Sequence, residues 1–137
     1  MLSHRARGAG RPLLILLVLL SFGLAFADNP RVLQVVANEY NQFKVPGQKK
    51  PVITVKANEV VRLRITSYKS TDWEKDGTVH SFTINALKDQ GWDLRLKEGT
   101  QEFTLVAPSE PGEYVVECTV RCGKGHDDMK MKLIVTP

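Results

Sequence analysis

Short runs in which apolar and polar residues alternate, separated by turn-forming residues, restrict this chain to an all-β architecture. In the run Val60–Ser67, apolar residues at every second position alternate with Arg62 and Arg64. This is the period of a strand with one buried face and one solvated face. No run between Asp28 and Pro137 has the period of an amphipathic helix. The core is therefore expected to form between β-sheets.

The other runs are bounded by Gly, Pro, Asn and Asp residues, as strands usually are. Seven or eight strands spaced by roughly 8–14 residues predict a Greek-key antiparallel β-sandwich. No repeat and no internal domain boundary is visible, so residues 28–137 are expected to form one domain. The candidate strands are Val32–Ala37, Pro51–Lys56, Val60–Ser67, Val79–Asn85, Trp92–Leu96, Gln101–Ala107, Glu113–Val120 and Lys130–Thr136.

The first 27 residues have the pattern of a signal peptide. A basic stretch ending at Pro12 precedes the apolar run Leu13–Phe26, and Ala25 and Ala27 fit a cleavage site. A membrane-spanning helix needs about 20 apolar residues, and this run is shorter. We expect residues 1–27 to be cleaved before Asp28, with an uncleaved N-terminal membrane anchor as the alternative. Either case predicts an exported domain, in the periplasm or on the outer face of the cytoplasmic membrane.

The net charge of +4 comes mostly from this leader. Arg5, Arg7 and Arg11 lie in it, and it contains no acidic residue. The remaining 16 basic and 15 acidic residues nearly cancel. The charge therefore gives no reason to expect a nucleic-acid partner, and membrane contact is expected only if the leader stays uncleaved.

One segment between two predicted strands is almost entirely polar. Tyr68–Gly77 contains Trp73 among charged and small residues, which is typical of a long surface loop. Trp73 either anchors this loop by packing or belongs to a surface that docks a partner, since aromatic residues are enriched at such surfaces.

Most of the side chains able to bind a transition metal fall within twelve residues. Cys118, Cys122, His126 and Met129 have the spacing C-x3-C-x3-H-x2-M, and the only other histidine after the leader is His80. Thiolate, thioether and imidazole are the donors that select copper. A zinc site more often has four Cys or His ligands and no methionine. Glycines within the cluster allow the loop to fold tightly around one centre.

This cluster, following the strand motif Val79-His80-Ser81-Phe82, resembles the CuA domain of cytochrome c oxidase subunit II. The similarity extends to Pro111-Gly112-Glu113-Tyr114 before the first cysteine, and to the region around Tyr40, Phe43 and Pro46. It covers nearly all of residues 34–136. The resemblance implies a cupredoxin-like sandwich.

The resemblance also implies a metal centre with two copper ions per chain. Cys118 and Cys122 would be bridging ligands, and His80 and His126 would each bind one copper ion. Met129 would be a weak terminal ligand, and the backbone carbonyl of Val120 would be the sixth donor; a carbonyl ligand makes no demand on the side chain at that position.

Several other interpretations remain open at this stage. The centre could be a mononuclear blue-copper site built from His80, Cys122, His126 and Met129, with Cys118 not involved. The two cysteines could form a structural disulfide, although so small a loop would stabilise little. His80 could be an ordinary strand histidine. Met131 and the apolar residues that follow it recur at every second position of the strand, so Met131 is expected in the core.

These observations favour a one-electron carrier whose partner is another redox protein, such as a c-type cytochrome or an oxidase complex. A copper storage or delivery protein with the same ligands is the alternative. The sequence gives no sign of a stand-alone enzyme, because a filled set of ligands leaves no open position for a substrate. The chain would at most be the electron-entry subunit of an oxidase-like complex.

Overall fold

The computed structural model describes residues 29–137. The leader predicted over residues 1–27 therefore lies outside the described residues. Within residues 29–137, no helix combines the length and the apolar character needed to cross a bilayer.

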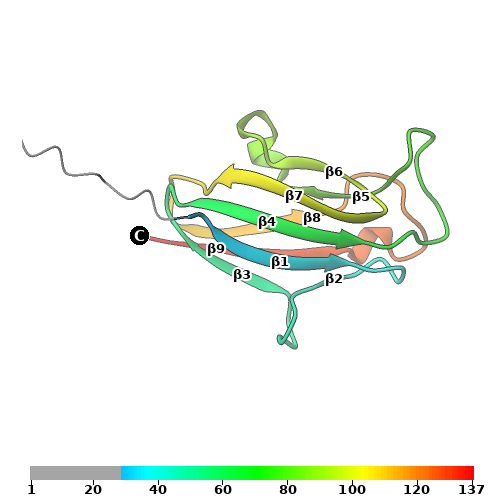
Figure 1. Cartoon of the computed structure of the whole chain (residues 1–137), viewed down its shortest axis with the longest axis horizontal. Coiled ribbons are helices and arrows are strands. Elements are labelled where there is room, and N and C mark those ends of the chain that lie inside the picture. Colours follow the sequence, from blue (N-terminus) through cyan, green and yellow to red (C-terminus); the bar gives the residue numbers. More distant parts are fainter. Residues whose placement is uncertain (1–28) are drawn as a thin grey trace, which may run out of the picture.

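Two β-sheets pack against each other with the core between them (Figure 1). One sheet has the strand order β2-β1-β4-β7 and the other has the order β3-β9-β8-β5-β6. Two short 3₁₀ helices, η1 (Asn85–Gln90) and η2 (His126–Asp128), lie in the connections. The strands are β1 (Arg31–Ala37), β2 (Phe43–Lys44), β3 (Val52–Lys56), β4 (Val60–Ser67), β5 (Thr78–Thr83), β6 (Asp93–Lys97), β7 (Gly99–Val106), β8 (Gly112–Glu117) and β9 (Lys130–Thr136).

The predicted all-β sandwich is confirmed, and each of the eight predicted strands corresponds to an observed one. The ninth strand of the described chain, β2, is only two residues long and too short to show an alternating pattern. Five of the seven strand pairings are antiparallel, as expected, but β1 pairs with β4 and β3 pairs with β9 in parallel. After β2 the chain crosses to the second sheet, where it forms β3. It then crosses back to the first sheet and forms β4, which runs in the same direction as β1.

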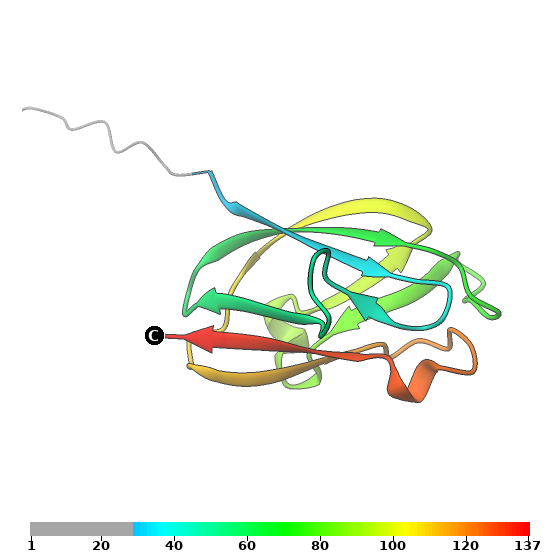
Figure 2. The same cartoon turned by 90° about the horizontal axis from the view of Figure 1, so that it is seen from below.

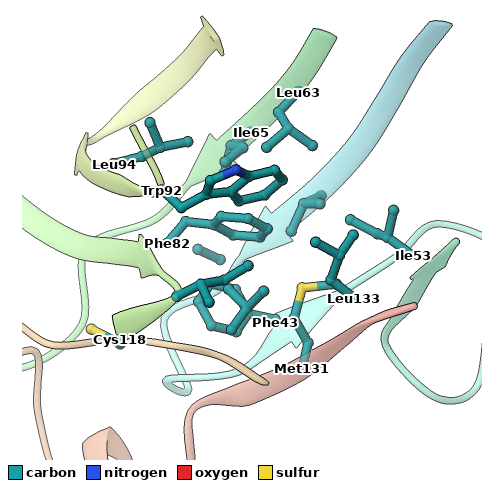
Figure 3. Packing of buried hydrophobic residues seen from close by; sticks show 14 of the residues in the cluster. Phe43, Ile53, Leu63, Ile65, Phe82, Trp92, Leu94, Cys118, Met131 and Leu133 are labelled. Atoms are coloured by element: carbon teal, nitrogen blue, oxygen red, sulfur yellow. The ribbon is translucent and has the colours of Figure 1, made fainter. Parts of the chain in front are cut away.

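The core is formed by the inward side chains of both sheets (Figure 3). Phe43 and Phe82 pack edge to face with their ring centroids 5.6 Å apart, an arrangement that aromatic pairs prefer. Trp92 is 1% exposed, and its indole Nε1–H donates to the carbonyl of Val106 at 3.1 Å. Trp92 is thus a core residue, and so is Met131, which the sequence predicted to lie in the core.

Strand β5 is buried along its whole length. One face, which includes Phe82, points into the core. The opposite face is covered near Ser81, whose hydroxyl contacts Thr119 in the segment after β8. His80 lies on the same face as Phe82, since side chains alternate along a strand. Its side chain therefore points into the space between the two sheets.

Three connections gather at one end of the sandwich (Figures 1 and 2). They are the turn between β1 and β2, the loop between β4 and β5, and the connection between β8 and β9. The β4–β5 loop spans residues 68–77, so the predicted surface loop is confirmed. The C-terminus and the start of β1 lie at the opposite end. The cysteine cluster belongs to the first end, far from both.

Candidate metal centre

The five predicted side-chain donors come from two segments that meet at this end. His80 lies in β5, and the other four lie in the connection between β8 and β9. Strands β8 and β9 are antiparallel neighbours with Glu117 opposite Lys130. The next pair closes the connection, because the backbone N–H of Cys118 donates to the carbonyl of Met129 at 3.1 Å. The ends of the ligand loop, residues 118–129, are therefore fixed by the sheet itself.

The donor atoms of His80, Cys118 and Cys122 all lie within 4.8 Å of one another. Two atoms bound to the same ion at bond lengths near 2.3 Å can be at most about 4.6 Å apart. Cys118 Sγ and Cys122 Sγ are 3.4 Å apart. These three side chains could share a metal ion with only small adjustments.

The remaining predicted donors surround the two sulfurs. Cys122 Sγ lies 3.5 Å from His126 Nδ1 and 4.0 Å from Met129 Sδ. Cys118 Sγ lies 3.3 Å from the carbonyl oxygen of Val120. The structure therefore brings together all six predicted donor groups, each within reach of one of the two sulfurs.

Burial separates the two histidines. His80, Cys122 and Met129 are fully buried, and Cys118 is 5% exposed. His126, in η2, is only partly buried. His126 is therefore the more exposed of the two imidazoles.

The ring of His80 is held in one orientation by a backbone carbonyl. Its Nε2 lies 2.8 Å from the carbonyl oxygen of Tyr68, which can only accept, so Nε2 carries the proton. Nδ1 then presents a lone pair, and it is buried without a hydrogen-bond partner among the described residues. Leaving such an atom unpaired costs about 1–3 kcal/mol. A metal ion at Nδ1 would remove this cost, and metal-bound histidines commonly donate their other nitrogen in this way.

The pKa values of the two thiols are shifted in opposite directions. The hydrogen bond with Cys122 lowers the pKa of Cys118 to about 3, against the opposing effect of burial, and a contact with His80 lowers it further. The same sulfur–sulfur contact, together with burial, raises the pKa of Cys122. The contact between the sulfurs thus favours the thiolate at Cys118, and thiolate is the form that binds metals.

A chain of hydroxyl groups fixes the start of the ligand loop to β5. Ser81 Oγ accepts from the backbone N–H of Thr119 at 2.8 Å and lies 2.9 Å from its hydroxyl. Thr83 Oγ1 in turn lies 3.0 Å from Ser81 Oγ and 2.8 Å from a carboxylate oxygen of Asp93. Sequence reasoning missed these residues, although Ser81 directly follows the predicted ligand His80.

The rim of the site carries both charges and an exposed aromatic ring. Arg121 forms an ion pair with Asp72 at 2.6 Å. Trp73 is 49% exposed, and the ammonium of Lys69 lies 4.3 Å from the centre of its ring. Trp73 is thus only half covered by its own loop, and a surface able to contact a partner remains.

Neither a known family model nor a curated protein sequence matches this chain. Solved structures do resemble it. A chain of a heme-copper terminal oxidase dimer has 22% identity and a TM-score of 0.56, with 77% of this chain and 65% of that chain covered. The periplasmic domain of subunit II of cytochrome oxidase from Bradyrhizobium japonicum has 16% identity and a TM-score of 0.55, with 77% and 83% covered.

A third structure, auracyanin A from Chloroflexus aurantiacus, is described as a "blue" copper protein. It has 20% identity and a TM-score of 0.50, with 79% of this chain and 100% of that chain covered. The chain thus spans about two thirds of the oxidase chain and the whole of the small auracyanin. At these identities the likeness concerns the fold. Residues 29–137 have a cupredoxin-like fold, similar to that of the periplasmic domain of cytochrome oxidase subunit II.

Proposed function

We propose that this chain is an exported one-electron carrier that uses a binuclear copper centre of the CuA type. The observation that carries the proposal is the meeting of His80, whose buried Nδ1 has no hydrogen-bond partner among the described residues, with two thiols. A ring nitrogen of His80 lies within 4.8 Å of both sulfurs, which are themselves 3.4 Å apart. A site of soft donors, closed off from solvent and with an orphaned nitrogen, has the chemistry that selects copper.

In this proposal Cys118 and Cys122 would be ligands shared by two copper ions, and Nδ1 of His80 and Nδ1 of His126 would each hold one of them. Met129 and the carbonyl of Val120 are weak outer donors. The positions of the two imidazoles support this assignment of ligands. A ring nitrogen of His80 lies within 4.8 Å of both sulfurs, and His126 Nδ1 lies 3.5 Å from Cys122 Sγ. Copper bound by such donors supplies a couple between Cu(I) and Cu(II), which is the capacity to take up and release one electron.

The mononuclear blue-copper alternative is favoured by the fold likeness to auracyanin A. It would use His80, Cys122, His126 and Met129 and leave Cys118 without a role. Cys118, however, belongs with His80 and Cys122 to the group of donor atoms that lie within 4.8 Å of one another, and its sulfur is 3.4 Å from that of Cys122. A mononuclear centre has no need of a second buried thiol beside the first, so Cys118 supports two ions.

The rigidity of the site favours electron transfer over storage or delivery. The donors are buried, the ends of the ligand loop are fixed by the β8–β9 ladder, and the ring of His80 is held by Tyr68. Preorganised donors change their positions little when an electron is added or removed. A protein that delivers copper would instead need an easy route for releasing it.

We infer that the partner is a redox protein such as a c-type cytochrome or an oxidase complex, met in the periplasm or at the outer face of the cytoplasmic membrane. His126 is the ligand with exposed surface, so contact is expected at this end of the sandwich. The rim carries charges of both signs. Association should therefore depend only weakly on salt.

Film voltammetry of the copper-loaded protein tests the proposed activity. We expect a reversible wave for one electron per chain that persists over repeated cycles without loss of copper. The zinc-loaded protein is the control and should give no wave. Loss of copper to a Cu(I) chelator after the first reduction, with no returning wave, would favour storage or delivery instead.

A further inference from the structure

Asn41 is a buried polar residue in a turn whose other residues are exposed or half-buried. It lies between β1 and β2 and is 5% exposed, whereas its neighbour Tyr40 is 71% exposed. The turn is built by Asn38, whose side-chain oxygen accepts from the backbone N–H groups of Tyr40 and Gln42. Asn41 has a φ of 57°, which asparagine tolerates better than most residues. The turn itself makes no use of the Asn41 side chain.

Both polar atoms of the Asn41 side chain bind to other loops. Nδ2 donates to the carbonyl of Cys122 at 2.9 Å, across 81 residues of sequence. Oδ1 accepts from the hydroxyl of Ser70 at 2.9 Å, in the β4–β5 loop. Because a carbonyl can only accept, the amide orientation is determined. Asn41 therefore joins all three connections at this end of the sandwich.

The ligand loop is shaped to admit this side chain. A Cβ atom on Gly123 would lie 2.9 Å from Asn41 Oδ1 and 2.6 Å from Thr71 Oγ1. A Cβ atom on Gly125 would lie 2.9 Å from Asn41 Cβ and 3.0 Å from the carbonyl of Tyr40. Gly123 also has a φ of 134°, which favours glycine. The two glycines that follow Cys122 thus leave the space that Asn41 fills.

We infer that Asn41 is a positioning residue, which fixes the peptide of Cys122 and thereby the direction in which its sulfur points. The inference rests on the proposed function, in which Cys122 would be one of the two cysteine ligands shared by both ions. Asn41 binds no metal. It acts through the carbonyl of Cys122, and Ser70 holds the amide from the other side.

Asn41→Asp tests this role, because aspartate has the same shape and can still accept from Ser70 but cannot donate to Cys122. Asn58→Asp is the matched control. Asn58 also has a left-handed conformation, with a φ of 61°, but it lies in the β3–β4 turn and is exposed. Asn41→Gly keeps the left-handed turn without the side chain, and it serves as a second variant if Asn41→Asp does not fold.

The first measurement uses metal-free, reduced protein and follows alkylation of Cys122 by iodoacetamide. Cys122 is fully buried, so it reacts only when the ligand loop opens. Losing a hydrogen bond to a buried partner should speed this reaction by about tenfold or more. The second measurement follows copper release to a chelator and the EPR spectrum. Copper binding should weaken by about 10–100-fold, with altered hyperfine splitting, in the Asn41 variants and not in Asn58→Asp.

Equal alkylation rates and equal spectra in Asn41→Asp and Asn58→Asp would overturn the inference and leave Asn41 a turn residue. The alkylation measurement contains no copper. Failure of the unaltered protein to bind copper would therefore overturn the proposed function alone. An intact copper spectrum with no effect of the Asn41 variants would overturn only the role of Asn41.

Discussion

Replacing Cys118 or Cys122 with serine is expected to abolish the optical and EPR spectra of the copper-loaded protein, whereas Met129→Leu is expected to keep the copper and shift its potential. Each sulfur lies within reach of the other donors, so loss of either thiolate removes a bridge between the ions. Replacing a residue that only hydrogen-bonds to a metal ligand lowers the metal affinity by about 10–100-fold, so the loss of a ligand shared by both ions should lower it further. Met129 Sδ lies 4.0 Å from Cys122 Sγ, and a thioether would be a weak donor that mainly tunes the potential.

Met131→Leu is the matched control for the methionine change. Met131 is also a buried thioether, 3% exposed, but it lies in β9 among the core residues. It should leave both the spectrum and the potential unaltered. An unchanged spectrum in Cys118→Ser would remove that cysteine from the ligand set and return the site to the mononuclear alternative.

Phe82→Ala is expected to lower the free energy of unfolding of the metal-free protein by about 3–5 kcal/mol. Phe82 lies two residues after His80 in β5 and is fully buried, and its ring packs edge to face on Phe43. A small domain has only about 5–15 kcal/mol of total stability, so this change removes a large part of it. Urea unfolding followed by circular dichroism measures the loss. The metal-free starting protein should give a β-type spectrum and a cooperative transition, because most of the core residues lie in strands outside the ligand loop.

Val115→Ala is the control for this measurement. Val115 is an apolar strand residue that is 54% exposed, and truncating it should change the stability by less than about 0.5 kcal/mol. Equal losses for the two variants, or a metal-free protein without a cooperative transition, would contradict the view that the core is independent of the metal.

The strands could be predicted because alternation is a local signal. In β4 and β9 the side chains that face the core recur at every second position, so the sequence alone defined both strands. The parallel pairing of β1 with β4 depends on which sheet β3 joins, and no local pattern records that choice. Strand β2 has two residues, and its existence depends on pairing with β1 rather than on its own sequence.

The ligands of the site could also be predicted from a local pattern, but the long-range contacts that orient them could not. The donors from Cys118 to Met129 lie in one short segment, and His80 was the only other histidine after the leader. The contacts that orient them are long-range. Tyr68 acts through its backbone carbonyl, which any residue could supply, and Asn41 lies 81 residues from Cys122. The glycines after Cys122 were visible in the sequence, but not the side chain that they accommodate.

The central claim is that two copper ions share one electron between the thiolates of Cys118 and Cys122. Metal analysis and EPR of the reconstituted protein test it most directly, because the count and the hyperfine pattern come from one sample. We expect two copper ions per chain and a multi-line pattern from an electron shared by both nuclei. One copper ion per chain with a four-line pattern would contradict the binuclear centre.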